Sequence, residues 1–485
     1  MKNWIIELIK MVVGEMGISE KEMPVFTLEH PDDMKNGDFA TNAALMLAKQ
    51  LKKSPVEVAR QITEKLNQNK ITEVEKIEVA GPGFINFYLK SEYFNKEVRE
   101  ILNRKEKYGQ NDLLHNQKTT VEYTDPNPFK EFHIGHLMTN IIGETLAYLE
   151  EANGARVTRA CYQGDVGLHV AKAIWGAKRM LQDNPTSRKE FFGGLFGFGK
   201  NPKIWGQAYA FGATKYEEDE MAKKEIISLN KVIYERTDQE INKIYDIGRK
   251  VSLQEFERLY NILGTHFDKY FFESEMAGLG KALVESNIST GVFEKSDGAV
   301  IFRGEKYGLH TRVFINGEGL PTYEAKELAL AKIKFDQTDY DKSIVVTGNE
   351  INDYYKVVMK VLDLIYPELA KKVEHIGHGM LRLPSGKMSS RTGKVIGGEF
   401  LLNEIKKLVL EKMKDREFTV KEKENIAEII SIGAIKYSIL KQAAGSDIIF
   451  DFDKSLSFEG DSGPYLQYSY VRAKSILEKA GKEGI

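Results

Sequence analysis

Phe132-His133-Ile134-Gly135-His136 is the stretch that decides the fold of this chain, because the sequence pattern changes on either side of it. Residues 119–123 before it alternate in polarity and are rich in β-branched side chains, which predicts a strand. After it, apolar residues recur at helical spacing up to Leu149, and Asn153-Gly154 predicts the end of that helix. Residues 156–160 resemble a second strand, so the stretch opens the helix of a βαβ unit.

The turn at the start of this helix has the chemistry of a phosphate site. A helix N-terminus offers unpaired N–H groups and a partial positive charge. Gly135 lets a nucleotide approach the backbone, and the imidazoles of His133 and His136 can donate to phosphate oxygens as charge moves. Two histidines at this spacing are more often surface residues, so the turn needs a second element to support it.

That second element is Gly386-Lys387-Met388-Ser389-Ser390-Arg391-Thr392-Gly393-Lys394. It is a glycine-bounded, hydroxyl-rich stretch with three cations, which suits a mobile clamp over a polyphosphate. Taken alone it would be read as a solvated basic loop. The two elements in this order, separated by most of a large domain, are much more specific.

Together the two elements resemble the signatures of class I aminoacyl-tRNA synthetases, and within that class the chain resembles arginyl-tRNA synthetases. The likeness covers essentially all 485 residues. Residues 36–44 and 81–87 resemble the additional N-terminal domain of that family. Further matching stretches are Asp125-Pro126-Asn127-Pro128, Gly164-Asp165-Val166-Gly167, Leu320-Pro321-Thr322-Tyr323, Gly379-Met380 and Gly463-Pro464-Tyr465-Leu466-Gln467-Tyr468.

The resemblance implies an α/β fold: a Rossmann-type nucleotide-binding catalytic domain with an α+β N-terminal additional domain and C-terminal helices. We place the additional, tRNA-contacting domain at 1–108, after which the polar residues 105–116 read as a linker. The catalytic domain is expected at 118–400, with an insertion at about 170–300. Residues 401–485 would lead into an anticodon-binding bundle, for which members of the family have roughly a hundred further residues. The chain could therefore be a fragment, a split protein or a naturally short enzyme.

Local patterns give further expectations of secondary structure. Gly348-Asn349 follows a buried-type strand, at a place where doubly wound sheets bind ligands. The other expected features are helices near 43–48, 56–59, 426–440 and 470–477, a strand over 79–89 broken by Gly-Pro-Gly, an irregular packed loop at 191–199, and a solvated helix face at 217–224.

Composition limits the class of protein. A hydrophobic content of 42% with 29% charged residues is ordinary for globular proteins, and 485 residues predict several domains. No apolar run approaches the ~18 residues that span a bilayer. Cys161 is the one cysteine, which excludes disulfides within the chain and a cysteine-based zinc site. We therefore expect a cytoplasmic enzyme.

The net charge of −2 and pI of about 6.6 are not those of a typical nucleic-acid binder. A tRNA partner is still compatible with them, because phosphate contacts need only a local basic face.

The resemblance implies the substrates ATP, arginine and tRNA(Arg), with Mg²⁺ carried by ATP, no protein-bound metal, and a monomer. His133 and His136 would contact the phosphates and ribose of ATP, with Gly135 under the adenosine. Lys387 and its neighbours would close over the pyrophosphate. The implied ATP-binding residues also include Gly379, Met380, Met388 and Ser389, and Arg391 joins Lys387 among the catalytic cations.

The lysine stretch departs from the family form, because Ser390 stands at the second lysine position and Arg391 at the last. Lys130, three residues before His133, is our candidate for the missing charge. The alternative is an ordinary exposed lysine, since surface ion contacts are common.

Arginine selection needs carboxylates that meet a planar guanidinium. The family pattern points to Tyr323 and Glu327, one helical turn apart, and to Glu273. Glu327 replaces the usual aspartate, and Glu350 stands near a usual glutamine, which makes it the weaker candidate. Asn127 would hold the α-amino or carboxylate group of the substrate. For each acid the alternative is a surface or helix-capping carboxylate.

Two other functions compete with arginine–tRNA ligation. Other nucleotidyl-transfer enzymes of this fold share the histidine motif but are much shorter and lack the N-terminal unit. A catalytically impaired, synthetase-derived tRNA-binding or regulatory protein fits the altered lysine stretch. The intact His133, Gly135, His136 and Lys387 argue against that second alternative.

Overall fold

The computed structural model describes residues 1–484 except 32, 70, 183–200 and 383–396. The run at 191–199 and the site candidates Lys387, Met388, Ser389 and Arg391 lie outside the described residues. Contacts divide the chain into two units, Met1–Gln110 and Asn111–Ile485, and each is described by itself.

The first unit is an antiparallel sheet with strand order β1-β2-β4-β3, packed on helices. Ile9, Leu47, Ile62 and Phe87 are among the apolar residues that are completely buried in its core. Its elements are α1 (Lys2–Glu15), η1 (Glu20–Glu22), β1 (Leu28–Glu29), η2 (Met34–Asn36), β2 (Phe39–Thr41), α2 (Ala43–Leu51), α3 (Pro55–Gln68), β3 (Val74–Ala80), β4 (Phe84–Leu89), α4 (Ser91–Arg104) and η3 (Lys105–Lys107). The helices expected near 43–48 and 56–59 are confirmed as α2 and α3.

The strand predicted over 79–89 is broken at Gly-Pro-Gly, as expected, but its two parts belong to two strands that pair with each other as a hairpin. Ala80 pairs with Phe84, and the residues between them make the turn. Gly81 and Gly83 have φ angles of 51° and 128°, which L side chains rarely adopt. The Gly-Pro-Gly sequence therefore reverses the chain between β3 and β4 instead of interrupting one strand.

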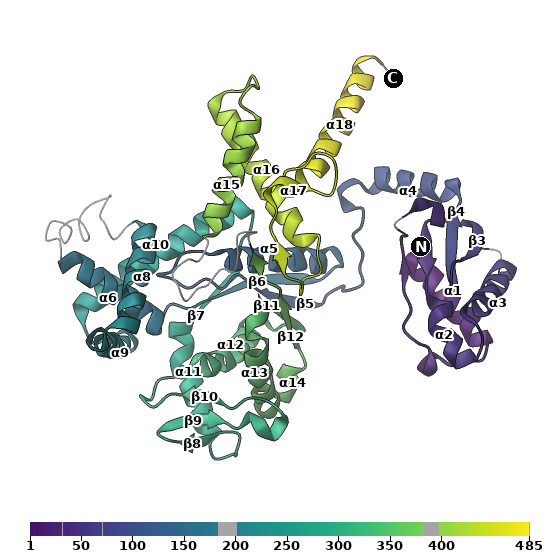
Figure 1. Ribbon diagram of the computed structural model, residues 1–485. Helices are drawn as coiled ribbons and strands as arrows, with labels where there is room; N and C mark the ends of the chain where they lie inside the picture. The colour runs from purple at the N-terminus through teal and green to yellow at the C-terminus, as the bar shows by residue number, and fades with distance from the viewer. Residues whose placement is uncertain (32, 70, 183–200, 383–396, 485) are drawn as a thin grey trace. The chain divides into compact units, whose positions relative to one another are not determined.

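The second unit is built on a five-stranded parallel sheet with strand order β12-β11-β5-β6-β7 (Figure 1). Its strands are β5 (Lys118–Glu122), β6 (Arg156–Gln163), β7 (Lys269–Phe272), β11 (Lys342–Gly348) and β12 (Val373–His378), and α5 (Ile134–Ala152) joins β5 to β6. This order is that of the doubly wound nucleotide-binding fold, with the switch point between β5 and β11. The expected α/β Rossmann-type fold and the βαβ unit are confirmed.

Helices separate β6 from β7: α6 (Leu168–Gln182), α8 (Pro202–Glu218), α9 (Glu220–Glu235) and α10 (Gln239–Leu263). The charge run at 217–224 is mostly exposed, as expected, but it does not lie on one helix. Asp219 ends α8 and caps α9, since its side chain accepts from the N–H groups of Met221 and Ala222. The run is therefore a helix–helix junction.

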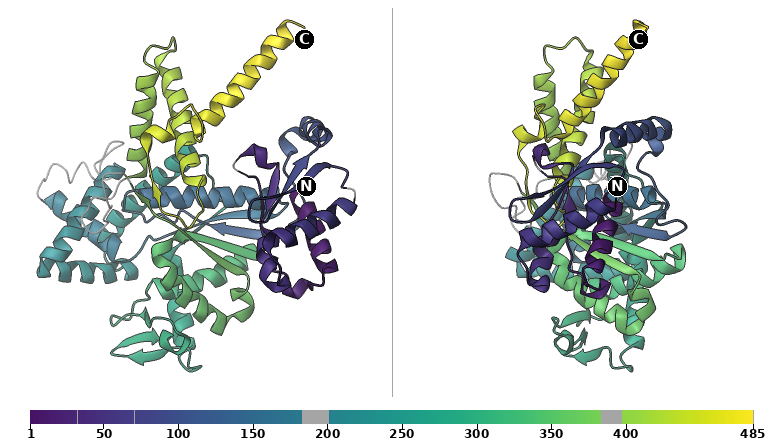
Figure 2. Two further views of the ribbon diagram at one scale, coloured as in Figure 1. Left: turned by 45° about the vertical axis from the view of Figure 1, so that its right-hand side comes forward. Right: turned by 90° about the vertical axis from the view of Figure 1, so that its right-hand side faces the viewer.

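Between β7 and β11 the chain forms a small antiparallel sheet and two helices. Figure 2 shows this sheet on the side of the parallel sheet away from α15, α16 and α18. The elements, with those that follow β11, are α11 (Glu273–Ser286), β8 (Glu294–Ser296), β9 (Ala299–Phe302), η5 (Gly304–Tyr307), β10 (Arg312–Ile315), α12 (Tyr323–Thr338), η6 (Asn349–Ile351), α13 (Asn352–Ile365) and α14 (Pro367–Ala370).

Helices dominate the last part of the chain, as predicted. Helix α16 begins with a capping box between Thr419 and Glu422. The elements are β13 (Leu381–Arg382), α15 (Gly398–Lys412), α16 (Val420–Leu440), β14 (Ile448–Ile449), α17 (Phe452–Ser455) and α18 (Gly463–Lys482). None of the described helices combines the length and the apolar character that a membrane crossing requires.

The main core of the second unit fixes where α5 begins. Val121 of β5, Leu137 and Ile141 of α5, and Ile435 of α16 belong to one buried cluster. A Cβ at Gly143 would lie 2.2 Å from the Tyr123 ring, so only glycine lets α5 lie this close to the segment after β5. The histidine turn is thus held against the carboxyl end of β5.

Candidate active site

The candidate site lies at the carboxyl edge of the parallel sheet, where several segments distant in sequence meet. Residues 123–133 follow β5, and Gly164-Asp165 follows β6. Glu273 opens α11 directly after β7, and Gly379 follows β12. Doubly wound sheets bind ligands at this edge, beside the switch point.

The two histidines cap α5 reciprocally. The backbone N–H of His136 donates to Nδ1 of His133 at 3.3 Å, and the N–H of His133 donates to Nδ1 of His136 at 3.2 Å. The rings stack with their centroids 3.6 Å apart. Because each Nδ1 accepts a hydrogen bond, each neutral ring carries its proton on Nε2.

Their surroundings keep both rings neutral. Burial, with the charge of Lys130, lowers the pKa of His133 to about 4. Burial, His133 and Lys130 lower the pKa of His136 well below its usual range. At neutral pH the turn therefore presents two Nε2–H donors beside the N-terminus of a 19-residue helix, a suitable arrangement for phosphate oxygens.

The loop between β5 and α5 has a strained backbone. Thr124, Asp125 and Phe129 have positive φ angles, of 78°, 45° and 71°. Two hydrogen bonds hold it: the N–H of Tyr162 donates to Oδ1 of Asp125 at 2.7 Å, and the N–H of Phe129 donates to Oγ of Ser252 at 2.9 Å. The loop is thus fixed in the shape that carries Asn127 and Lys130.

Asn127 and Glu273, predicted to bind arginine, converge on the backbone of Gly164. A Cβ there would lie 2.2 Å from Oδ1 of Asn127 and 3.0 Å from Oε1 of Glu273. Glu273 is buried, with 4% of its surface exposed. Asn127 lies in the loop after β5 and Glu273 is the first residue of α11, more than a hundred residues later, and the sheet brings the two side chains together.

Tyr323 and Glu327 lie one turn apart on α12, as predicted. Tyr323 is 51% exposed, whereas Glu327 is half-buried and accepts from the Tyr355 hydroxyl at 3.5 Å. Burial and the neighbouring carboxylate of Glu122 raise the pKa of Glu327, a shift to which Glu273 adds. The site thus contains a carboxyl group that a cationic ligand would ionise.

Glu350 follows a different strand, β11. It is exposed in η6 at the end of β11, and its carboxyl group folds over Gly348, where a Cβ would lie 2.2 Å from Oε2. Its carboxyl charge acts on His378.

Lys130 lies beside the histidine turn, half-buried, with Nζ 4.9 Å from the centroid of the Tyr209 ring. Burial and the charge of Lys172 lower its pKa to about 8. Its charge acts on His133, His136 and Glu273 alike. Its charge therefore influences both the candidate phosphate position and the candidate arginine position.

Gly379 and Met380 are bound to the segment before β14. The N–H of Gly379 donates to the Ala444 carbonyl at 2.8 Å, and the N–H of Met380 donates to Asp447 at 2.9 Å. His378 connects this segment to α5, because its Nε2 lies 2.7 Å from the Thr139 hydroxyl.

Sequence reasoning missed three residues of the site: Asp165, His169 and Lys326. Asp165, fully buried, accepts from Ser274, Tyr245 and Arg249 and so ties α10 and α11 to the end of β6. His169 donates through Nε2 to the Gly164 carbonyl at 2.7 Å, and its Nδ1 lies 3.4 Å from the Tyr323 hydroxyl. The only signal in the sequence was that each of them lies in or next to a stretch that resembles the arginyl-tRNA synthetase family.

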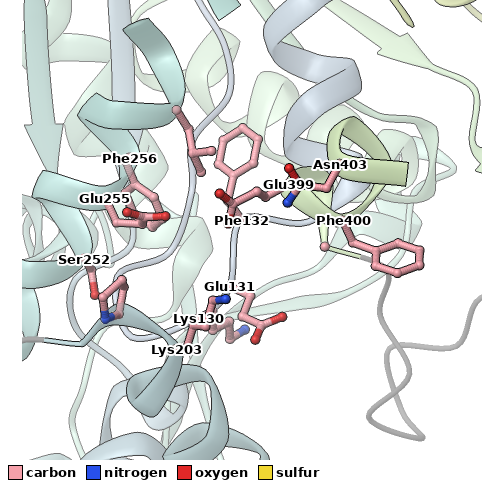
Figure 3. A pocket seen from close by; sticks show the side chains of 13 residues that line it. Lys130, Glu131, Phe132, Lys203, Ser252, Glu255, Phe256, Glu399, Phe400 and Asn403 are labelled. Atoms are coloured by element: carbon pink, nitrogen blue, oxygen red, sulfur yellow. The ribbon is translucent and has the colours of Figure 1, made fainter. Parts of the chain in front are cut away.

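A cavity of about 610 Å³ opens beside the histidine turn, between residues 130–132, α10 and the start of α15 (Figure 3). Phe132, Phe256 and Phe400 surround it, with Lys130 and Lys203 at its lower end in that view. It adjoins the candidate phosphate position; Glu273 and Glu327 are not among its lining residues.

Among the described residues, no cluster of three or more His, Cys, Asp or Glu side chains is placed to hold a metal ion. Three carboxyl groups at this edge are instead paired with lysine or arginine side chains. Lys326 pairs with Glu273, Lys334 with Glu122 at 2.6 Å, and Arg249 with Asp165 at 2.8 Å.

Comparison with known proteins identifies the relatives of this chain. The family described as "tRNA synthetases class I (R), catalytic domain" matches residues 97–452, and "Arginyl tRNA synthetase N terminal domain" matches residues 3–89. The arginine–tRNA ligase of Clostridium acetobutylicum is 32% identical over 456 residues, which cover 94% of this chain and 78% of that protein. The enzyme of Clostridium botulinum strain 657 is 31% identical over 483 residues, 99% of this chain and 82% of that protein.

Solved structures share the fold. The arginyl-tRNA synthetase of Thermus thermophilus superposes with a TM-score of 0.72 at 23% identity, covering 99% of this chain and 82% of that one. The arginyl-tRNA synthetase of Plasmodium falciparum gives a TM-score of 0.72 at 20% identity, covering 99% and 81%. The family matches and the identities over most of both chains agree: this chain belongs to the class I arginyl-tRNA synthetases.

Proposed function

We propose that this chain activates arginine with ATP and transfers it to tRNA(Arg). In the first step a carboxylate oxygen of arginine attacks the α-phosphorus of ATP, the bond to the bridging oxygen breaks, and pyrophosphate leaves. In the second step a ribose hydroxyl of the terminal nucleotide of tRNA attacks the carbonyl carbon, and AMP leaves. One observation carries the proposal: the histidine turn and a group of carboxylates suited to a guanidinium share one edge of the sheet.

Little covalent chemistry falls to the protein in the first step, so positioning and charge stabilisation must supply the rate. We assign the phosphate contacts to Nε2–H of His133 and His136 and to the N-terminus of α5, with Gly135 under the nucleotide. Lys130 supplies a cation from the β5 side. Gly379, Met380, Lys387, Met388, Ser389 and Arg391 complete the proposed ATP site.

We assign arginine binding to Asn127, Glu273, Tyr323 and Glu327, with Glu350 as a further candidate. Two separate carboxylates suit a planar guanidinium, which donates in several directions in one plane.

Mg²⁺ would arrive with ATP, bound by phosphate oxygens. Residues 1–108 would contact tRNA, 118–400 would catalyse activation, and 401–485 would lead into the anticodon-binding region, in a cytoplasmic monomer.

Arginine-dependent ATP–pyrophosphate exchange tests the proposal, measured with and without arginine-accepting tRNA and against lysine and glutamine. We expect exchange with arginine alone among the three amino acids. Exchange that appears only when tRNA is added would still support the assignment and would show that the chain engages its tRNA. No exchange in either condition, or exchange with a different amino acid, would overturn it.

A further inference from the structure

Lys326 is a buried cation inside the proposed arginine site. It precedes Glu327 on α12, and only 2% of its surface is exposed. Its ammonium group donates to Oε2 of Glu273 and, at 3.3 Å, to the hydroxyl of Tyr234. It also lies 4.5 Å from the centroid of the Tyr323 ring.

This ammonium group stays charged. Burial opposes the charge, but the adjacent Glu273 carboxylate outweighs that effect and raises the pKa of Lys326 above its usual range. The free enzyme therefore already contains a lysine ammonium bound to the acid that would recognise a cationic substrate.

Only one oxygen of Glu273 is left for a substrate. Lys326 takes Oε2, whereas Oε1 faces Gly164 and Asn127, and no described residue donates a hydrogen bond to it. A second acceptor lies on Glu327, one residue along α12 from Lys326.

We propose that Lys326 determines amino-acid specificity by occupying the ammonium position of the arginine site, so that free lysine is rejected and arginine is accepted. This inference rests on the proposed function. The ammonium group of a bound lysine is a compact, strongly hydrated point charge. In this site it would have to lie against the ammonium group of Lys326, which already shares the charge of Glu273. A guanidinium is more weakly hydrated, and its planar N–H groups reach Oε1 of Glu273 and Glu327 without displacing Lys326.

A purely structural role explains the arrangement less well. A buried ion pair is weak evidence for stability, because desolvation of both charges offsets their attraction. This pair also lies where Asn127, Tyr323 and His169 converge, and about half of the Tyr323 surface is exposed. Specificity gained by an unfavourable contact with the wrong ligand is a common device.

The test compares kcat/KM for arginine with kcat/KM for lysine in ATP–pyrophosphate exchange. Lys326→Met removes the charge at similar length, and Lys326→Arg retains a cation beside Glu273. Lys332→Met is the matched control, since Lys332 lies on the same helix, partly exposed and paired with Asp336 at 2.5 Å. We expect the arginine-to-lysine ratio to fall tenfold or more in Lys326→Met and to stay within twofold of wild type in Lys326→Arg and Lys332→Met.

Both values of kcat/KM are measured on the same enzyme preparation, so a partial loss of folded enzyme lowers both equally and leaves their ratio unchanged. If Lys326→Met turns over too slowly, calorimetric dissociation constants for arginine and lysine give the same ratio, with ATP binding as proof of an intact fold. An unchanged ratio, or loss of arginine binding with no gain of lysine binding, overturns the inference. Failure of the wild type to exchange with arginine would instead overturn the proposed function.

Discussion

His133 and His136 hold each other's backbone, since each Nδ1 accepts the N–H of the other residue while the rings stack 3.6 Å apart. One nitrogen of each ring thus caps the helix, and the other remains available to a ligand. Capping and ligand contact therefore use different atoms of the same side chains, and substitutions can separate the two.

His133→Asn separates them, because asparagine is a good N-cap but lacks the Nε2–H donor. We expect arginine-dependent exchange to fall ~10²–10³-fold, the usual loss for one transition-state donor, with little change in the unfolding temperature. His133→Ala should lose activity to a similar degree and also about 0.5–2 kcal/mol of stability with the cap. Exchange assays and thermal unfolding measure both; wild-type activity in the asparagine variant would contradict the assignment.

Glu327 should make arginine binding depend on pH. Burial and Glu122 raise its pKa, so a larger share of this carboxyl group is protonated in the free enzyme than in an ordinary glutamate. A guanidinium favours the ionised form, so arginine binding should release a proton and strengthen as the pH rises toward the raised pKa of Glu327, about 8. Calorimetry in buffers of different ionisation enthalpy measures this release.

In Glu327→Gln the proton release should disappear and the KM for arginine should rise far more than the KM for ATP, as it should in Glu327→Ala. An arginine KM equal to that of the wild type would remove Glu327 from the arginine site.

Lys130 should act on the chemical step. Loss of a charged hydrogen-bond donor is worth ~1.5–3 kcal/mol, so Lys130→Ala is expected to slow exchange about 10–100-fold with a smaller change in arginine affinity. Lys203→Ala is the control, because Lys203 lines the same cavity from α8. Equal activity of the two variants would show that Lys130 does not supply the charge missing at Ser390.

Gly164 should be intolerant of a methyl group. A Cβ would lie 2.2 Å from Oδ1 of Asn127 and 3.0 Å from Oε1 of Glu273, so both side chains must move in Gly164→Ala. We expect the KM for arginine to rise about tenfold or more, with the KM for ATP little changed. Gly278→Ala on α11, where nothing lies within 4 Å, should be neutral or slightly stabilising. Similar arginine KM values in both variants would contradict this geometry.

Local patterns predicted the elements around the histidine turn well. The change from alternation to helical spacing is confined to residues 119–149, so β5 and α5 follow from short-range rules. The hairpin at Gly81–Gly83 was missed because the local composition is the same whether a pair of glycines interrupts one strand or reverses the chain between two strands. Only the antiparallel register of β3 on β4 distinguishes the two.

Long-range placement was not available from the sequence. Glu273 meets Asn127 because β7 and β5 end at the same edge of the sheet, which only the family pattern suggested. Lys326 was overlooked because a lysine beside a glutamate on a helix is ordinarily a solvated residue. Its burial depends on α11 and α12 packing together, and no local pattern records that contact.

The strand order of the second unit has a consequence for synthesis on the ribosome. In the sheet, β5 lies between β6, which follows it in sequence, and β11, which comes much later. The contact of Lys118 with Asp341, on the β11 side of β5, joins residues 223 positions apart. At usual translation rates of ~5–20 residues per second, this edge of β5 waits on the order of tens of seconds for its partner. An uncovered strand edge invites pairing with other chains, so the nascent protein needs protection at this edge until β11 emerges.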